Sequence, residues 1–165
     1  MEPSEEVEMR SMIEDAYPSE EFSLPIFTIP TVVPGRTFLE KVFLLHEEFN
    51  RPNGCTHIER ITRHMYDIVK MMDKPFVMEA MQNTQLYEDI VAHRKKFSAW
   101  SELDYTTHLP HTISFLPPAS IKNVLREDYK QMKIGFIYAD APSFDEIMER
   151  LRDLQDRFRA LKWEK

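Results

Sequence analysis

Four side chains that bind anions or carry protons recur at spacings of three and four in the segment ERITRHMYDIVKMMD, residues 59–73. They are Arg60, Arg63, His64 and Asp67, and on a helix they would share one face. A pair between Arg63 and Asp67 at i, i+4 would leave Arg60 free to bind an anion. The same pattern also fits a solvated helix surface with local ion pairs, and spacing alone leaves both interpretations open.

Lys41 presents a similar choice on the preceding predicted helix. It lies at the edge of an apolar face, one turn before Leu45. A lysine in this position either extends its ammonium group to solvent or places a point charge in a cleft. If the two helices pack side by side, Lys41 should lie within about 10 Å of Asp67, the usual spacing of packed helices.

The helices that must position these side chains are predicted from apolar residues spaced three and four apart. Helical patterns cover residues 38–49, about 57–72, a short segment from Pro75, 83–100, 119–132 and 144–163. The segment 22–33 is β-branched, aromatic and interrupted by Pro25 and Pro30, which indicates a strand or extended segment. The predicted fold is mainly α, with about six helices and one or two short N-terminal extended or β segments.

Charge divides the 165-residue chain into two parts. Residues 1–22 hold eight acidic residues and one arginine and so account for the whole net charge of -7. The remainder is formally neutral, which leaves a locally basic surface for nucleic acid open. We predict an acidic N-terminal segment with an extended or β part over residues 1–33, followed by a helical domain over residues 34–165.

The amino-acid composition also indicates the cellular compartment. Cys55 is the only cysteine, so no disulfide forms within the chain, as a reducing cytoplasm requires. The sequence contains no apolar run of about 18 residues, and its N-terminus is acidic where a signal peptide would be basic. We therefore expect a cytoplasmic protein that does not span a membrane.

Two stretches, VPGRTFLEKVFLLHEEFNRP and RITRHMYDIVKMMD, occur in an order that resembles the C-terminal portion of the AbiEii/AbiGii abortive-infection toxins, a nucleotidyltransferase family. The elements that carry the resemblance are Arg36-Thr37-Phe38, Lys41 and Leu45-His46 on the first helix, then Arg63-His64, Tyr66 and Asp67 on the second. The resemblance extends over nearly the whole chain, from about Glu8 through the C-terminal FDEIMERLRDLQDRF.

The resemblance implies that Lys41 and Asp67 are catalytic and belong to the third and fourth active-site motifs of that family. Arg63, Arg60 and His64 would then bind the nucleotide and its phosphates. A lysine or arginine stabilises the charge that spreads over phosphoryl oxygens during transfer. Asp67 would either orient one of these cations or help to activate the attacking hydroxyl, and the sequence does not choose between these roles.

The partners that the resemblance implies are those of a bacterial toxin–antitoxin system that acts in phage defence. They are a nucleoside triphosphate as donor, an RNA acceptor such as tRNA, and a cognate antitoxin.

The first two motifs of the family, Gly-Gly-Ser/Thr and an Asp-x-Asp pair that would hold Mg²⁺, are absent from this sequence; the nearest match is Asp140-Ala141-Pro142. We therefore expect the C-terminal part of a longer enzyme, with Mg²⁺ bound by an upstream nucleotidyltransferase half. The strand at 22–33, which has no evident partner in the sequence, fits this expectation. Alone, the chain would bind no metal and be inactive. The alternative is a non-catalytic helical module that binds RNA or another partner.

Other polar groupings are weaker. His108 with His111, Cys55 with His57, and Asp89 with His93 each offer only two metal ligands, whereas a zinc site needs three or four. Surface polar residues explain these pairs better. The basic run HRKKF at 93–97 could touch RNA phosphates, but a solvated helix end is the preferred interpretation.

Overall fold

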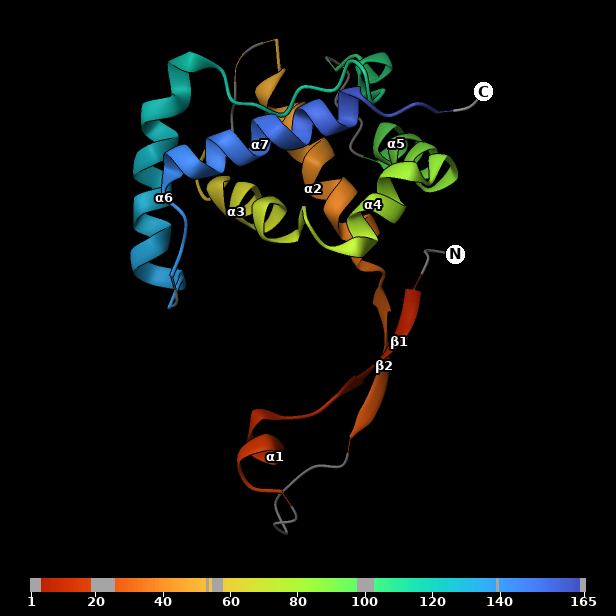
Figure 1. Cartoon of the computed structure of the whole chain (residues 1–165), viewed down its shortest axis with the longest axis vertical. Helices are drawn as coiled ribbons and strands as arrows, with labels where there is room; N and C mark the ends of the chain where they lie inside the picture. Colours follow the sequence, from red (N-terminus) through yellow and green to blue (C-terminus); the bar gives the residue numbers. More distant parts are fainter. Residues whose placement is uncertain are drawn as a thin grey trace. The chain divides into compact units, whose positions relative to one another are not determined.

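The protein is described by a computed structural model that covers residues 4–18, 26–52, 54, 58–97, 103–138 and 140–163. These residues form seven α-helices, two short 3-10 helices and one two-stranded antiparallel sheet (Figure 1). The prediction of a mainly α fold is confirmed, and all six predicted helices are present. The chain divides into two compact units, Met1–Pro34 and Gly35–Lys165.

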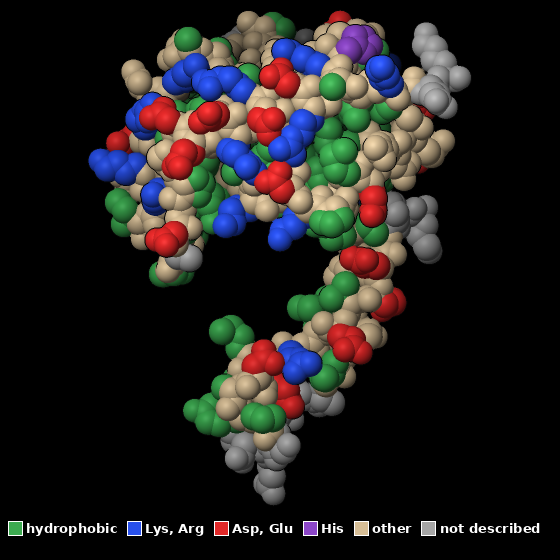
Figure 2. Space-filling model, in the orientation of Figure 1, with side chains coloured by type: hydrophobic (Ala, Val, Ile, Leu, Met, Phe, Trp, Pro, Cys, Tyr) green, Lys and Arg blue, Asp and Glu red, His purple; other side chains and the backbone are tan. Residues whose placement is uncertain are grey.

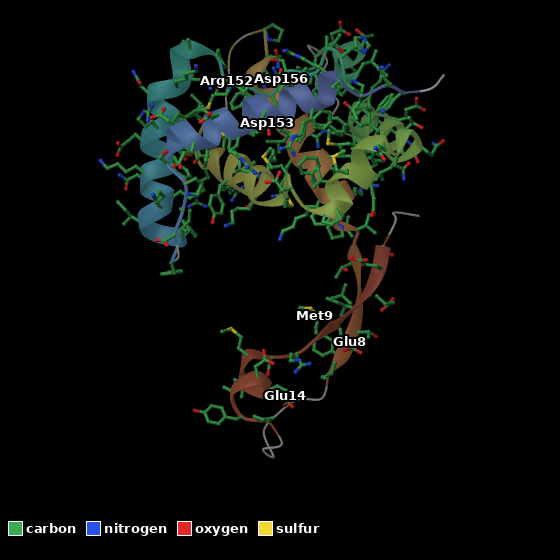
Figure 3. All side chains as sticks on the ribbon, in the orientation of Figure 1. Glu8, Met9, Glu14, Arg152, Asp153 and Asp156 are labelled. Atoms are coloured by element: carbon green, nitrogen blue, oxygen red, sulfur yellow. The ribbon has the colours of Figure 1, made fainter. Side chains whose placement is uncertain are left out.

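The N-terminal unit is a two-stranded hairpin with one short helix in the connection between its strands. Strand β1 (Ser4–Met9) pairs with β2 (Phe27–Val32) in a register that places Val7 opposite Ile29. The seventh helix, α1 (Met12–Ala16), lies between them and was not predicted. Because β2 has a partner in this chain, it lends no support to a sheet upstream. Most charged side chains of this unit are acidic, including Glu8 on β1 and Glu14 on α1 (Figures 2 and 3).

All the secondary-structure elements of the second unit are helices in the part that the structure describes. Its elements are α2 (Pro34–Phe49), α3 (Thr62–Met71), α4 (Pro75–Gln82), α5 (Thr84–Phe97), η1 (Tyr105–His108), η2 (Ala119–Ile121), α6 (Lys122–Phe136) and α7 (Phe144–Arg159). Figure 1 shows α6 at one end of this unit and α4 and α5 at the other, while α7 passes over α2 and lies beside α3, with which it is in contact. Local sequence sets several helix starts: Pro75 opens α4, and Ser143 and Glu146 form the predicted capping box of α7.

Helix α2 is the centre of this unit. Five of its apolar side chains are fully buried: Phe38, Leu39, Val42, Phe43 and Leu45. The ring of Phe38 stacks on Phe158 of α7 at 6.4 Å between centroids, and Phe43 meets Tyr87 of α5 edge-on at 4.7 Å. Since α2 is covered from several directions, it positions the helices around it.

Polar side chains on α2 are buried as well, and two of them, His46 and Glu47, have partners on distant segments. The carboxylate of Glu47 is fully buried and accepts two hydrogen bonds from Arg94 of α5, at 2.7 and 2.5 Å, and lies 3.2 Å from Nε2 of His108. Burial acts to raise the pKa of Glu47, but the hydrogen bonds from Arg94 and His108 outweigh it, so the pKa lies below its ordinary value.

These contacts correct one interpretation of the sequence and one residue of another. His108 is not a surface residue, because only 2% of it is exposed. The HRKKF run is an exposed helix end, as interpreted, except at Arg94, which is largely buried against Glu47. Both exceptions have one cause: the partner, Glu47, is 47 residues from Arg94 and 61 from His108.

His46, in the Leu-His element of the resemblance, attaches the segment after α5 to α2. Its Nδ1 accepts from the backbone N–H of Ser114 at 3.1 Å, and its Nε2 lies 3.0 Å from the hydroxyl of Thr107. Burial, together with the nearby His108, lowers the pKa of His46 to about 4, so the ring is neutral at pH 7. A neutral ring can accept at Nδ1 and donate at Nε2, which matches both contacts.

The contact between α2 and α4 leads to a prediction about two glycines. A Cβ on Gly35 would lie 2.8 Å from the Cβ of Ala80, whereas a Cβ on Gly135, in α6, would meet nothing within 4 Å. Gly35→Ala must push α2 and α4 apart and should lower the free energy of unfolding by about 1–3 kcal/mol. Gly135→Ala is the matched control and should raise it by up to about 1 kcal/mol. Urea denaturation measures both, and equal effects would contradict the close packing.

Candidate functional site

Helices α2 and α3 bring Lys41 and Asp67 into direct contact. The ammonium Nζ of Lys41 donates to Oδ2 of Asp67 at 2.8 Å, across 26 residues of sequence. The predicted proximity is confirmed. Because the side chains are 23% and 42% exposed, respectively, the pair lies at the edge of the protein, where a ligand can reach it.

Asp67 is therefore not available to Arg63. No ion pair joins Arg63 to Asp67 in the structure, as far as its described residues go, and the predicted i, i+4 pair is wrong. The physical reason is that Lys41 approaches Asp67 from a neighbouring helix, a contact that reading α3 alone does not reveal. Arg63 is exposed, and its guanidinium group forms no ion pair with the residues that the structure describes.

Helix α3 presents this face because its other side is in the core. Ile61 precedes the helix and Met72 follows it, and both are buried with Met65, Ile68 and Val69, as the apolar arc predicted. The helix begins at Thr62, later than the predicted start near residue 57. Arg60 therefore lies in the turn before α3, and the prediction that it shares a helical face with Arg63 and His64 is wrong.

Arg60 has an unusual backbone conformation, which Asp128 of α6 holds in place. Its φ is 61°, in the left-handed region that side chains other than glycine seldom adopt. Oδ1 of Asp128 accepts from the backbone N–H of Arg60 at 2.9 Å, and Oδ2 accepts from both the backbone N–H and the hydroxyl of Thr62. Asp128 thus caps α3, whose own N-cap residue, Ile61, has no side chain that can do so.

Sequence reasoning missed Asp128. It lies 66 residues after Thr62, the first residue of α3, on an element in which an acidic residue is ordinary. The available signal was Ile61 at the N-cap position of α3 in place of Ser, Thr, Asp or Asn, which indicates that a cap comes from elsewhere in the fold.

His64 contacts Lys41 from the same helix as Asp67. Its Nδ1 lies 3.5 Å from the Lys41 Nζ. Burial, and then the positive charges of Lys41 and Arg63, lower the pKa of His64 to about 4, with Asp67 acting in the opposite direction. The ring is therefore neutral at pH 7, so Nδ1 can accept from the lysine. Lys41 is held between a carboxylate and an imidazole, and His64 itself offers a phosphate no charge.

A cavity of about 480 Å³ opens beside this pair, between α3 and α6. Arg60, Arg63, Tyr66 and Asp67 line one side, and Asp128 and the last turns of α6 line the other. Three of the five predicted site residues, Arg60, Arg63 and Asp67, thus border one space. Lys41 and His64 are not among the lining residues, but both lie next to Asp67. The arrangement suits an anion, because cations border a space that one small molecule can fill.

The described residues do not fit a Mg²⁺ site. Among them, no three His, Cys, Asp or Glu side chains come together in a way that could hold a metal ion. Asp67 is engaged by Lys41, and Asp128 by the start of α3. Cys55 and His57 lie outside the described residues. No helix in the described part of the chain is long and apolar enough to cross a membrane.

The low pKa of His64 predicts how stability depends on pH. In the folded state this pKa is about 4, below the ordinary 6.5, so an unfolded chain takes up a proton between these values and a folded one does not. The stability that the neutral ring of His64 contributes to the folded state is complete above pH 6.5 and is lost as the pH falls toward 4. Between pH 8 and pH 5 the wild type should lose about 1–2 kcal/mol more free energy of unfolding than His64→Asn.

Chemical denaturation at the two pH values provides this comparison. Asparagine is chosen because its amide oxygen can accept from Lys41 in place of Nδ1. His46, whose pKa is also low, is present in both proteins and cancels. Identical losses in wild type and variant would show that His64 is not held neutral by its surroundings.

Comparison with known proteins identifies the family. The family model described as "Nucleotidyl transferase AbiEii toxin, Type IV TA system" matches residues 1–150 of the 165. No curated protein and no solved structure gives a significant match. The match covers both helices that carry Lys41 and Asp67, together with the cavity beside them. The chain belongs to the AbiEii family of nucleotidyl transferase toxins of type IV toxin–antitoxin systems.

Proposed function

We propose that this chain is the C-terminal part of an AbiEii-like nucleotidyltransferase and supplies the positively charged side of its active site. The observation that carries the proposal is the contact between Lys41 of α2 and Asp67 of α3 at 2.8 Å, beside an exposed Arg63 that has no ion-pair partner in the described part of the chain. These residue types stand where the family resemblance expects catalytic groups. The reaction is transfer of a nucleotide from a nucleoside triphosphate to an acceptor, for which we propose RNA, such as tRNA.

Lys41 acts in this proposal by binding the triphosphate oxygens, on which negative charge develops as the phosphorus–oxygen bond breaks. A lysine has many rotamers, and Asp67 and His64 restrict them by accepting from its ammonium group. A cation that is already oriented stabilises the transition state without reorganising during the reaction. Of the two roles left open for Asp67, its contact with Lys41 supports the orienting role.

The groups that hold Mg²⁺ would lie in an upstream nucleotidyltransferase half, because the described residues do not fit that ion. In this arrangement the helical unit supplies the positively charged side chains of the active site, and the other half supplies the carboxylates that bind the metal. A type IV toxin also implies a cognate antitoxin as a partner.

A second candidate is a helical module that binds RNA or a protein without catalysing transfer. The observation that favours it is the absence of both Gly-Gly-Ser/Thr and Asp-x-Asp from the sequence, together with the lack of a metal-binding cluster among the described side chains. The two candidates differ in what Lys41 does: a module needs its charge for binding at most, whereas an enzyme needs it for turnover.

In the whole protein encoded by the gene, Lys41→Ala should lower nucleotidyl transfer about 100-fold or more, since it removes an oriented charge from the transition state. Asp67→Ala should lower it less, because Lys41 remains. Transfer is measured with labelled nucleoside triphosphates, Mg²⁺ and total tRNA. Both variants should change the free energy of unfolding by about 1 kcal/mol or less, as expected of a partly exposed pair.

Lys130→Ala is the matched control, because Lys130 forms a similar but exposed pair with Glu127 on α6. It should leave transfer unchanged. Full activity of Lys41→Ala would contradict the proposed role of the lysine. The 165-residue chain alone should label no RNA, and labelling well above its own Lys41→Ala variant would contradict the proposal that a second half is required.

A further inference from the structure

Acidic and basic side chains line the cavity between α3 and α6 in equal number, but they are not equally available to a ligand. Two carboxylates and two guanidinium groups line it, but both carboxylates are already engaged. Asp67 accepts from Lys41, and Asp128 accepts from the backbone at the start of α3, where the helix dipole is positive. Arg60 and Arg63 have no ion-pair partner anywhere in the described chain. The cavity therefore favours an anion.

The opposite side of the cavity is apolar and aromatic. Met132, Phe136 and Ile137 line it from the end of α6, facing Tyr66 on α3. Phe136 is 71% exposed, which leaves a large ring in water beside two arginines of the same cavity lining. Aromatic rings next to cations are the usual platform for a nucleobase with its phosphate, because the ring stacks on the base while the cation binds the backbone. An isolated phosphate would leave this side unused.

The backbone conformation that places Arg60 beside the cavity costs the folded protein free energy. A left-handed conformation costs a residue other than glycine about 1 kcal/mol, and asparagine less. Asp128 would cap α3 equally well if residue 60 were glycine or asparagine, because it binds only the backbone N–H of that residue. The arginine side chain therefore has a use that stability does not explain.

We propose that this cavity binds the nucleoside and the adjoining phosphate of the donor nucleoside triphosphate. The base lies against Phe136 and Tyr66, the adjoining phosphate against Arg60 and Arg63, and the outer phosphates extend past Asp67 toward Lys41. A volume of about 480 Å³ is in the range of small-molecule sites. Choosing a nucleotide as the ligand rests on the proposed function. Asp128 is a positioning residue, since it acts through Arg60.

Calorimetric titration of the 165-residue chain, without metal, tests the proposal. The probes are ATP, GTP, CTP and UTP, with tripolyphosphate as a ligand that has the phosphates and no base. We expect at least one nucleotide to bind about tenfold more tightly than tripolyphosphate, the gain that stacking of one base provides. If no nucleotide binds more tightly than tripolyphosphate, or if only a single-stranded RNA hexamer binds, the proposal is wrong.

Two variants assign the gain to the cavity. Phe136→Ser should remove the preference for the nucleotide and leave tripolyphosphate binding unchanged. Phe97→Ser, at an aromatic residue of α5 that is 65% exposed, is the matched control and should change neither. A preference that survives Phe136→Ser would overturn the proposed position of the base. Because Phe136 is mostly exposed, the substitution does not threaten folding.

Arg60→Asn should weaken both ligands about tenfold while the free energy of unfolding stays equal or rises, because asparagine adopts the left-handed conformation more readily. Arg152→Asn, at an exposed arginine on α7 outside the lining of the cavity (Figure 3), should leave both affinities unchanged. Unchanged binding by Arg60→Asn would overturn the role of that arginine.

The Lys41→Ala variant separates this inference from the proposed function. If it weakens both ligands while Phe136→Ser and Arg60→Asn have no effect, Lys41 keeps its role and the cavity is not the nucleoside site. If the two cavity variants act and Lys41→Ala does not, the nucleoside site stands and the role of Lys41 in phosphate binding is wrong.

Discussion

The burial of α2 is the constraint on which the helical unit depends. A helix covered by α4, α5 and α7 cannot leave its polar side chains to water, and an unpaired charge inside a protein costs several kcal/mol. Glu47 is therefore neutralised by Arg94, and His46 is satisfied by Thr107 and Ser114. Each contact attaches a distant segment to α2, so the same polar groups that would destabilise a buried helix fix the arrangement around it.

Lys41 is under the same constraint at the surface of the unit, where its partner is also accessible to solvent. Its ammonium group is partly buried and pairs with Asp67, so Arg63 forms no ion pair with the described residues. Had Asp67 paired with Arg63 on its own helix, the surface would carry one local ion pair and a loose lysine. The contact between the helices instead yields an oriented lysine and an uncommitted guanidinium group. Packing of α2 against α3 thus determines which cation is held and which is available.

Local patterns in the sequence were sufficient for six of the seven helices in the described part of the chain and for one long-range contact. Apolar spacing predicted the buried arc of α3, and the side-by-side packing of two such helices predicted that Lys41 approaches Asp67. What failed depends on partners that no local pattern contains. Arg94 and His108 have a buried carboxylate as their partner, β2 pairs with a strand 18 to 28 residues earlier, and Arg60 lies outside the helix, in a turn whose backbone Asp128 binds.

Arg60 shows how stability and function can be separated at one residue. The hydrogen bonds from Asp128 stabilise the start of α3 whatever side chain residue 60 carries, because they end on backbone N–H groups and on Thr62. The backbone conformation at that position favours glycine or asparagine, and the guanidinium group forms no ion pair with the described residues that would offset the strain. The strain at Arg60 is therefore not offset by an ion pair in the described part of the chain, and this is the reason for proposing that its guanidinium group serves an anionic ligand in the aromatic-lined cavity.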